Sequence, residues 1–348
     1  MLRIGVIGAG RNAREKHLPD IVADGRAELV AVANRSLESG RAVGDRFDVP
    51  EVYANWREFL ERAHLDAVVI GTWPDQHVEI AIAALQAGAH VLVEARLASS
   101  LADALALRDA VRAHPQQVVQ VVPAGFSLEQ DLTMKRLVED ELGELISVEG
   151  TFHDGDFADE SAPLHWRQDA RRVGINMMTL GRRYEVLLRW LPHVREVVAA
   201  GEVVVRERRD PSTNEMHALR LPDVLSVLGR YPGRAQLTLT MSTVTGHGPA
   251  PTVRIFGRDA TVLFDGASKQ IYLGRKDAGE LVEVVVPDHE RHPRRVIGEF
   301  LDSIVDQAPV RRTTLEDALR YTAFTDAVHR SLHSGGWETV EGDGSHPN

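Results

Sequence analysis

The sequence predicts an α/β protein whose first third forms a parallel sheet covered by helices and whose remainder forms an α+β domain with a large, mostly antiparallel open sheet. Two observations lead to this prediction. Short apolar runs alternate with helical segments over residues 2–122, and longer strand-like stretches with few helices follow. Continuous apolar runs that are each followed by a helix are typical of a parallel sheet buried on both faces.

The first third divides into short elements. Apolar runs predict strands over 2–7, 28–33, 52–53, 66–70, 90–94 and 118–122. Helical periodicity predicts helices over 11–23, 37–47, 77–87 and 101–113, of which the third ends at Gly88. The alternation of the two kinds of element predicts a first domain over residues 1–122.

The pattern changes near Pro123. Helices are expected over 128–140, 175–190, 294–306 and 315–331. Strands are expected over 146–152, 194–206, 224–228, 235–243, 252–256, 260–264 and 281–286. These elements predict a second domain over 123–335, followed by a disordered tail over 336–348.

Composition excludes several classes of function. The chain has 348 residues, which favours two domains, and a net charge of −11, so neither nucleic acid nor an anionic membrane is an expected partner. It contains no cysteine, which excludes a disulfide framework and a thiolate metal site. No apolar run reaches the roughly 18 residues of a membrane span, and no signal-peptide pattern is present, so a cytoplasmic location is expected. Lysine occurs only at Lys16, Lys135, Lys269 and Lys276.

A glycine turn follows the first strand. Gly8-Ala9-Gly10-Arg11-Asn12-Ala13 fits the pattern G-x-G-x-x-G/A and opens the first helix. The first glycine allows a tight turn, the second allows the backbone to approach a pyrophosphate, and the small last residue allows the helix to pack closely on the strand. N–H groups at the helix N-terminus then face the phosphates. This motif predicts a dinucleotide-binding (Rossmann) domain.

The end of the second strand indicates which cofactor is bound. NAD sites usually place a carboxylate there, whereas NADP sites place an arginine nearby. The sequence has Asn34-Arg35-Ser36 and no carboxylate. Arg35 suits a 2′-phosphate, and Asn34 and Ser36 suit hydrogen bonds to it, so NADP is favoured and NAD remains the alternative.

Several motifs together resemble the Gfo/Idh/MocA family, which includes glucose–fructose oxidoreductase and inositol dehydrogenase. They are Ile7-Gly8-Ala9-Gly10, Val69-Ile70-Gly71-Thr72-Trp73-Pro74, His77, Ala87-Gly88-Ala89-His90-Val91-Leu92-Val93-Glu94, Trp166-Arg167 and Leu187-Leu188-Arg189-Trp190-Leu191. The resemblance implies an NAD(P)-dependent oxidoreductase with a Rossmann domain, and a homo-oligomer formed through the open sheet. It also implies cofactor contacts at Thr72, Trp73, His77, Glu94 and Arg167. The alternatives are that Trp73 serves packing and that His77 caps the helix it opens.

The chain departs from this family at its catalytic positions. Most members carry Glu-Lys-Pro after the strand that ends at Glu94, and their lysine transfers a proton at the substrate hydroxyl; here the triplet is Glu94-Ala95-Arg96. The family also has an aspartate and a histidine four residues apart on one helix, and the matching positions are Thr179 and Arg183. All three expected acid–base groups are therefore replaced.

Replacement groups are available near these positions. Arg183 stays protonated and suits an anion clamp or a carbonyl polariser. Tyr184, His165 and His153 are candidate acids. A neighbouring arginine would lower the pKa of Tyr184, and the alternative is that Tyr184 is buried in the helix packing. Asn176 and Thr179 are candidates for hydrogen bonds to a substrate. The arginines at 167, 171, 172, 182 and 183 indicate an anionic small-molecule substrate if they face the cleft; the alternative is that most are solvated or paired with nearby carboxylates.

Two functions remain open from the sequence. The first is an NADP(H)-linked oxidoreductase with an atypical proton relay, acting on a carbonyl, imine or sugar-like substrate. The second is a catalytically inactive family member that binds a nucleotide or sugar ligand as a sensor or partner subunit. Asp154-Gly155-Asp156 is interpreted as a loop cap, so no metal site is expected.

Overall fold

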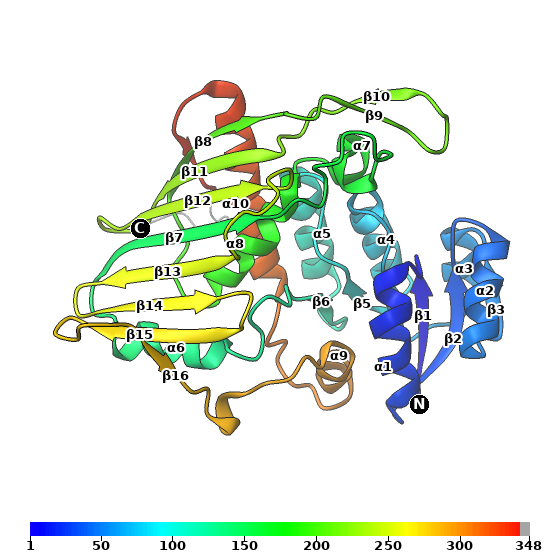
Figure 1. The fold of residues 1–348 in the computed structure, drawn as a ribbon. Coiled ribbons are helices and arrows are strands. Elements are labelled where there is room, and N and C mark those ends of the chain that lie inside the picture. Colours follow the sequence, from blue (N-terminus) through cyan, green and yellow to red (C-terminus); the bar gives the residue numbers. More distant parts are fainter. Residues whose placement is uncertain (342–348) are drawn as a thin grey trace. The chain divides into compact units, whose positions relative to one another are not determined.

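A computed structural model describes residues 1–341, which form two compact units (Figure 1). The first unit comprises Met1–Pro123 and Arg295–Leu319. The second comprises Ala124–Arg294 and the residues from Arg320 onward. The two predicted contiguous domains therefore differ from the structure at one point, because the chain returns to the first unit after Arg294.

The first unit contains a six-stranded parallel sheet with the order β3-β2-β1-β4-β5-β6. Its strands are β1 (Leu2–Ile7), β2 (Ala27–Ala33), β3 (Glu51–Tyr53), β4 (Ala67–Ile70), β5 (His90–Val93) and β6 (Val119–Val121). This is the strand order of a Rossmann fold, in which ligands bind at the carboxyl ends of the strands where the order reverses. The reversal lies between β1 and β4, so the glycine turn after β1 stands at that point.

Helices cover this sheet. They are η1 (Ala13–His17), α1 (Leu18–Ala23), α2 (Leu37–Phe47), α3 (Trp56–Arg62), α4 (Pro74–Gln86), α5 (Leu101–Ala113) and α9 (Val296–Val305). Residues 11–23 are helical as expected, but η1 is a one-turn π-helix that directly follows the glycine turn. Such turns occur frequently at functional sites.

Helix α9 belongs to the first unit. Its side chains Ile297, Phe300 and Leu301 are fully buried in the same core as Leu18 and Ile21. Asp302 also accepts a hydrogen bond of 2.7 Å from Arg26. The sequence placed this helix in the second domain, because amphipathic periodicity shows that a helix has a buried face but not which sheet covers it.

The second unit contains a nine-stranded sheet with the order β16-β15-β14-β13-β7-β12-β11-β8-β17. Its strands are β7 (Leu145–His153), β8 (Glu196–Glu202), β11 (Val224–Arg230), β12 (Gln236–Ser242), β13 (Thr252–Gly257), β14 (Ala260–Asp265), β15 (Gln270–Arg275), β16 (Val282–Val284) and β17 (Glu338–Thr339). β12 and β7 are parallel, and the other pairs are antiparallel. The predicted fold class is therefore confirmed.

The remaining elements of the second unit are a separate two-stranded ribbon and several helices. They are β9 (Glu207–Arg209), β10 (Met216–Ala218), α6 (Asp131–Asp140), η2 (Trp166–Gln168), α7 (Ala170–Val173), η3 (Met177–Thr179), α8 (Leu180–Leu188), η4 (Asp288–Glu290) and the part of α10 (Leu315–Ser334) that begins at Arg320. Helix α8 packs closely on α10 at Gly181. A Cβ built on this glycine would lie 3.0 Å from side-chain atoms of Tyr321 and Thr325.

Two predictions about chain ends and helix starts are wrong. The helix expected over 175–190 begins only at Leu180, because Met178 (φ 42°) and Thr179 (φ 62°) adopt left-handed backbone conformations. The tail expected to be disordered from residue 336 contains β17, which pairs with β8 through Glu338 and Thr339. Residues 342–348 of that tail lie outside the described residues.

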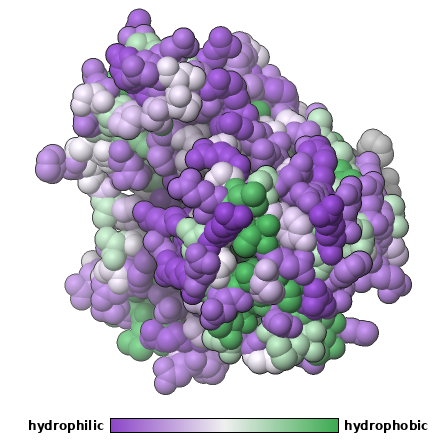
Figure 2. Space-filling model, turned by 90° about the vertical axis from the view of Figure 1, so that its right-hand side faces the viewer, coloured by the Kyte–Doolittle hydropathy of each residue, from purple (hydrophilic) through white to green (hydrophobic). Residues whose placement is uncertain are grey.

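The surface drawn in Figure 2 is mostly hydrophilic, with smaller patches of hydrophobic residues between the charged ones. Among the helices of residues 1–341, none combines the length and hydrophobicity that a membrane span requires.

Candidate functional site

The glycine turn is held tightly by its neighbours. Gly8 has φ 81°, and a Cβ there would lie 2.7 Å from the backbone nitrogen of Thr72. The N–H of Gly8 donates to the carbonyl of Ala33 at 2.8 Å, and the N–H of Gly10 donates to the carbonyl of Gly8 at 2.7 Å. Only glycine fits position 8, because both its backbone conformation and the adjacent loop exclude a side chain.

Gly10 is different, because its surroundings are open. It is exposed, and the nearest atom to a Cβ built on it is the carbonyl oxygen of Gly8 at 4.0 Å. The structure of the protein therefore does not require glycine at this position, whereas close approach of a pyrophosphate does. The first turn of the following helix supplies N–H groups without helical partners, which suit phosphate oxygens. The cradle thus fits a dinucleotide.

Two residues at the end of β2 have structural roles. The Asn34 amide oxygen accepts a hydrogen bond from the N–H of Ala9 at 2.8 Å, and its NH₂ group donates to the carbonyl of Ser39 at 3.1 Å. The Ser36 hydroxyl caps α2 by accepting from the N–H of Ser39. Arg35 between them is exposed. Asn34 therefore fixes the glycine turn, and Arg35 is the candidate for reading the cofactor's ribose.

Glu94 closes a buried polar cluster behind the glycine turn. Its Oε1 lies 2.8 Å from Nε2 of His17 and accepts a hydrogen bond from the Asn12 amide. The imidazole of His17 is fully buried, and 17% of the Glu94 side chain is exposed. The predicted cofactor residues Asn12 and Glu94 are thus brought together, and His17 is a member that sequence reasoning missed.

The predicted cofactor role of His77 does not fit its surroundings. Its side chain is 1% exposed, Nδ1 lies 2.9 Å from the carbonyl oxygen of Arg96, and Nε2 lies 3.0 Å from that of Thr72. Burial lowers the pKa of His77. The imidazole therefore fixes the loop that carries Thr72 and Trp73.

Three other predicted cofactor residues remain accessible. Thr72 and Trp73 are half-buried at the start of α4. Arg11 is exposed and pairs with Glu15 at 3.5 Å.

Arg183 lies in an aromatic setting on α8. Its guanidinium carbon is 4.9 Å from the ring centroid of Phe126 and 4.8 Å from that of Phe152. Within residues 1–341, no carboxylate forms an ion pair with this guanidinium. Burial and then the charge of Arg182 lower the pKa of Arg183 to about 10, and Asp154 partly opposes this. Arg183 is thus a half-buried cation without a counterion among those residues.

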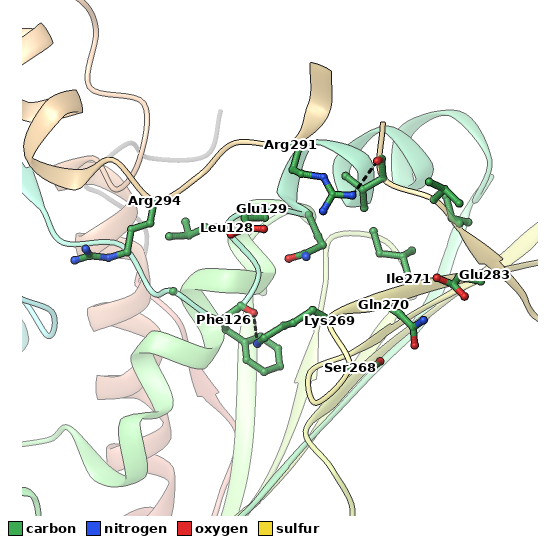
Figure 3. Close-up of a pocket in the computed structure, with 15 residues that line it drawn as sticks. Phe126, Leu128, Glu129, Ser268, Lys269, Gln270, Ile271, Glu283, Arg291 and Arg294 are labelled. Carbon is green, nitrogen blue, oxygen red and sulfur yellow. Dashed lines mark hydrogen bonds between the residues drawn. The ribbon is translucent and has the colours of Figure 1, made fainter. Parts of the chain in front are cut away.

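A second cation, Lys269, shares one of these rings. It lies in the turn between β14 and β15, and its Nζ donates to the carbonyl of Phe126 at 2.8 Å and stands 4.7 Å from the Phe126 ring centroid (Figure 3). Burial and the charge of Arg183 lower the pKa of Lys269. Sequence reasoning missed this lysine because it is 86 residues from Arg183; the rarity of lysine in the chain was the available indication.

Phe126 and Lys269 also line a pocket of about 530 Å³ in the second unit (Figure 3). Its other charged lining residues are Glu129, Glu283, Arg291 and Arg294. Within residues 1–341, no group of three or more His, Asp or Glu side chains is arranged to hold a metal ion.

Tyr184 is not placed to act as an acid. Its side chain is 0% exposed and stacks on Phe324 with ring centroids 3.7 Å apart. Its hydroxyl lies 2.7 Å from Nδ1 of His193 and accepts from the N–H of Val194 at 2.9 Å. Burial raises the pKa of Tyr184, although the neighbouring Arg183 was expected to lower it. That expectation is wrong because the ring is buried in the helix packing, which was the alternative.

Tyr184→Phe therefore tests a structural role. Removing the hydroxyl leaves the buried N–H of Val194 without an acceptor, so the free energy of unfolding is expected to fall by about 1–3 kcal/mol. Denaturant unfolding measures this change. Turnover under conditions where the variant is folded is expected to stay within about twofold of the wild type, and a loss of turnover without a loss of stability would restore Tyr184 as an acid.

His165 and Arg167 lie together at η2. Nδ1 of His165 accepts from the N–H of Arg167 at 3.2 Å, and its ring packs between Phe157 and Trp166. Burial and the charge of Arg167 lower the pKa of His165, so the imidazole is neutral at pH 7. The exposed guanidinium of Arg167 lies 4.7 Å from the Trp166 ring centroid. His165 is thus half-buried, and its Nδ1 already accepts a hydrogen bond from the backbone.

The approach to α8 is strained rather than helical. Asn176 is buried and donates to the carbonyl of Val173 at 2.7 Å. Met178 and Thr179 are consecutive non-glycine residues with positive φ, a conformation that costs on the order of 1–3 kcal/mol each and clusters at active sites. Thr179 precedes α8, so it does not share a helix face with Arg183 as the four-residue spacing suggested.

One of the predicted arginines is paired with a carboxylate. Arg171 pairs with Asp169 at 2.9 Å and is not an anion clamp.

Comparison with known proteins gives the same assignment for both halves of the chain. Residues 2–122 match the sequence model of the oxidoreductase family with an NAD-binding Rossmann fold. Residues 132–263 match the model of the Gfo/Idh/MocA C-terminal domain. The chain belongs to the Gfo/Idh/MocA family. The resemblance inferred from the motifs is thereby confirmed, and the family's Rossmann domain accounts for the glycine cradle.

Individual relatives of this Gfo/Idh/MocA protein are distant. An uncharacterised oxidoreductase of Rhizobium meliloti is 26% identical over 98% of this chain and 99% of its own length. An inositol 2-dehydrogenase/D-chiro-inositol 3-dehydrogenase of Shouchella clausii is 32% identical over 42% of this chain and 43% of its own. Levoglucosan dehydrogenase in complex with NADH and L-sorbose has a TM-score of 0.83 at 20% identity, covering 98% of this chain and 99% of that one, which shows a shared fold.

Proposed function

We propose that this protein is an NADP(H)-linked oxidoreductase that reduces the carbonyl or imine group of a small, sugar-like or anionic substrate. The observation that carries the proposal is Arg183, a desolvated cation at the position where the family has its catalytic histidine. A cation held in low-dielectric surroundings is stabilised when negative charge develops beside it. A half-buried guanidinium with no ion-pair partner among residues 1–341 is suited to that task.

Reduction agrees with the groups present better than alcohol oxidation does. Oxidation of an alcohol requires a base for the hydroxyl proton, and the family's lysine, aspartate and histidine are replaced by Ala95, Thr179 and Arg183. Reduction requires instead that the C=O or C=N bond be polarised. Arg183 donates two parallel N–H bonds in a fixed geometry, which suits a developing oxyanion or a carboxylate beside it.

A bound nicotinamide cofactor would supply the hydride. Gly8 and Gly10 would admit its pyrophosphate, and the N–H groups after Gly10 would bind the phosphate oxygens. The cluster of Asn12, His17 and Glu94 would support the first helix turn, and its partly exposed carboxylate would accept a hydrogen bond from a ribose hydroxyl.

The preference for NADP rests on Arg35. With Asn34 and Ser36 engaged in local hydrogen bonds, Arg35 is the exposed cation beside the expected ribose position. Arg35→Ala is expected to weaken NADPH binding about tenfold and to leave NADH binding unchanged, because the two cofactors differ by the 2′-phosphate. Calorimetric titration of both cofactors measures this difference. Equal losses for both would show that Arg35 does not contact that phosphate.

A substrate screen tests the proposal. Purified protein is incubated with NADPH and a panel of sugar lactones, keto sugars, keto acids and cyclic imines, and the nicotinamide absorbance is followed. Consumption of NADPH with one class, lost in Arg183→Met, is the expected result. Alcohol oxidation is tested in the same way with levoglucosan or an inositol and NADP⁺ or NAD⁺, because the names of relatives contain these compounds. Turnover of alcohols would overturn the proposed direction.

The second candidate, a non-catalytic ligand-binding family member, is favoured by one observation: three acid–base groups of the family are replaced, and Tyr184 is enclosed in the helix packing. Tight cofactor binding with no turnover of any substrate in either direction would establish this role in place of the reductase.

A further inference from the structure

We propose that Lys269 is the proton donor of this site and takes the place of the lysine that the family carries at the position of Ala95. The inference rests on the proposed reductase function and names the acid that it requires. Three features support it: the location of the ammonium group, the hydrogen bonds that hold the turn carrying it, and a second cation at the same aromatic ring.

The turn between β14 and β15 holds Lys269 in place. The Asp265 carboxylate accepts from the N–H groups of Ala267 and Ser268 at 2.8 and 3.2 Å. The N–H of Gly266 donates to the carbonyl of Pro251 at 2.7 Å, and a Cβ at Gly266 would lie 2.4 Å from the Phe126 ring. The ring thus packs directly on the turn, and the Lys269 backbone is fixed with φ 62°.

Lys269 is an exposed residue whose ammonium group nevertheless lies against aromatic rings. Its Nζ bonds to the carbonyl of Phe126 and stands 4.7 Å and 6.0 Å from the ring centroids of Phe126 and Phe264 (Figure 3). The hydrogen bond uses one of the three N–H donors of an ammonium group, so donors remain for a substrate atom. The same Phe126 ring lies 4.9 Å from the guanidinium carbon of Arg183.

The two cations at the Phe126 ring have different roles in the proposed reduction. A bound reduced nicotinamide would supply the hydride to the carbonyl carbon, and the C=O π electrons would move to oxygen. Arg183 stabilises the charge that develops on that oxygen. The Lys269 ammonium then transfers a proton to it, which leaves an alcohol and a neutral amine that is reprotonated from water. Lysine suits this task because nearby positive charge and burial readily shift its pKa.

Two charged groups act on the protonation of Lys269, namely Arg183 on α8 and Asp265 on β14. The other charged residues that line the same pocket are Glu129 before α6, Glu283 on β16, and Arg291 and Arg294 before α9. Burial and Arg183 lower the pKa of Lys269, and Asp265 opposes them. Since the donor must be protonated, kcat for reduction is expected to be constant below the pKa of Lys269 and to fall above it.

Three variants separate proton transfer from charge. Lys269→Met is expected to lower kcat by about 100-fold, within the usual range for general acid catalysis. Lys269→Arg keeps the charge but cannot release its proton, so it is expected to show a similar loss, to keep KM within about threefold, and to lose the fall of kcat at high pH. Lys276→Met, at an exposed lysine after β15, is the matched control and is expected to behave as the wild type. Wild-type turnover and an unchanged pH profile in Lys269→Arg would overturn the inference while leaving the reductase function standing.

A titration without substrate provides an independent readout. Reductive ¹³C-methylation labels all four lysines, and nuclear magnetic resonance follows each amine. Lys269 is expected to titrate below the ordinary lysine pKa, and its pKa is expected to rise in Arg183→Met because a neighbouring positive charge is removed. If Lys269 titrates at the ordinary lysine pKa and does not respond to Arg183→Met, the inference is overturned. If this titration behaves as expected but the wild type turns over no substrate, the proposed function has failed, and with it the role assigned to Lys269.

Discussion

Gly10→Val is expected to weaken NADPH binding about 100-fold without lowering the melting temperature. A factor of 100 corresponds to about 2.8 kcal/mol of binding free energy. The protein itself leaves room for a side chain here, since the nearest atom to a Cβ is 4.0 Å away. The valine methyl groups would instead occupy the space that the cradle leaves for a pyrophosphate. Calorimetric titration and thermal unfolding of the same preparation measure both quantities.

Two other glycines provide controls for this prediction. Gly25→Ala lies in the same unit at a position with no other atom within 4 Å, and it is expected to change neither binding nor stability. Gly8→Ala is expected to lose both, because a Cβ there collides with the backbone of Thr72. Undiminished NADPH binding by a folded Gly10→Val variant would show that the dinucleotide does not lie on the glycine turn.

Arg183→Met is expected to lower kcat/KM for reduction by about 100- to 1,000-fold while cofactor affinity stays unchanged. This is the usual cost of removing one group that stabilises developing negative charge. Methionine fills the space against Phe126 and Phe152 without the desolvation cost of a half-buried cation, so stability is expected to be retained. Steady-state kinetics, cofactor titration and denaturant unfolding measure the three effects.

Arg183→Lys and Arg182→Met complete the comparison. Lysine keeps the charge but loses the planar pair of donors, so partial recovery of about tenfold over methionine is expected. Arg182→Met removes the neighbouring charge on the same helix and is expected to change kcat/KM by less than about threefold. Unchanged kinetics in Arg183→Met would contradict the role of this arginine and would favour a site elsewhere on the second unit.

The first unit was largely predictable from the sequence, because its rules are local. Apolar runs buried on both faces mark parallel strands, and the glycine turn after β1 marks the position where the strand order reverses. Ser36 and Ser100, which cap α2 and α5, mark helix starts that agree with the expected ranges. The strand-like stretches after Pro123 also predicted the open sheet of the second unit, in agreement with the family resemblance.

The remaining differences come from long-range contacts that periodicity does not encode. Helix α9 carries an ordinary amphipathic pattern, and its packing against Leu18 and Ile21 is decided by the tertiary fold. β17 pairs through two residues, Glu338 and Thr339, which is too short a segment for an alternating pattern to be recognised. The start of α8 was misplaced because Met178 and Thr179 are not residues that normally mark a left-handed turn.

The candidate site was predicted only in part for the same reason. Arg183 was found through its position in the family pattern, but its aromatic setting and its neighbour Lys269 depend on a turn that is distant in sequence. His17 was overlooked because a buried histidine on an apolar helix face is usually a core residue; here it pairs with Glu94. Tyr184 was assigned to chemistry because it adjoins Arg183 in sequence, whereas neighbours on a helix point about 100° apart.

The most direct test of the account is a calorimetric titration of cofactor-free wild-type protein, first with NADPH and then with NADH. The account predicts saturable binding of NADPH that is at least about tenfold tighter than binding of NADH, because it assigns Arg35 to the 2′-phosphate and the sequence has no carboxylate at Asn34-Arg35-Ser36. Absence of binding for both cofactors would contradict the oxidoreductase function, since hydride transfer requires one of them.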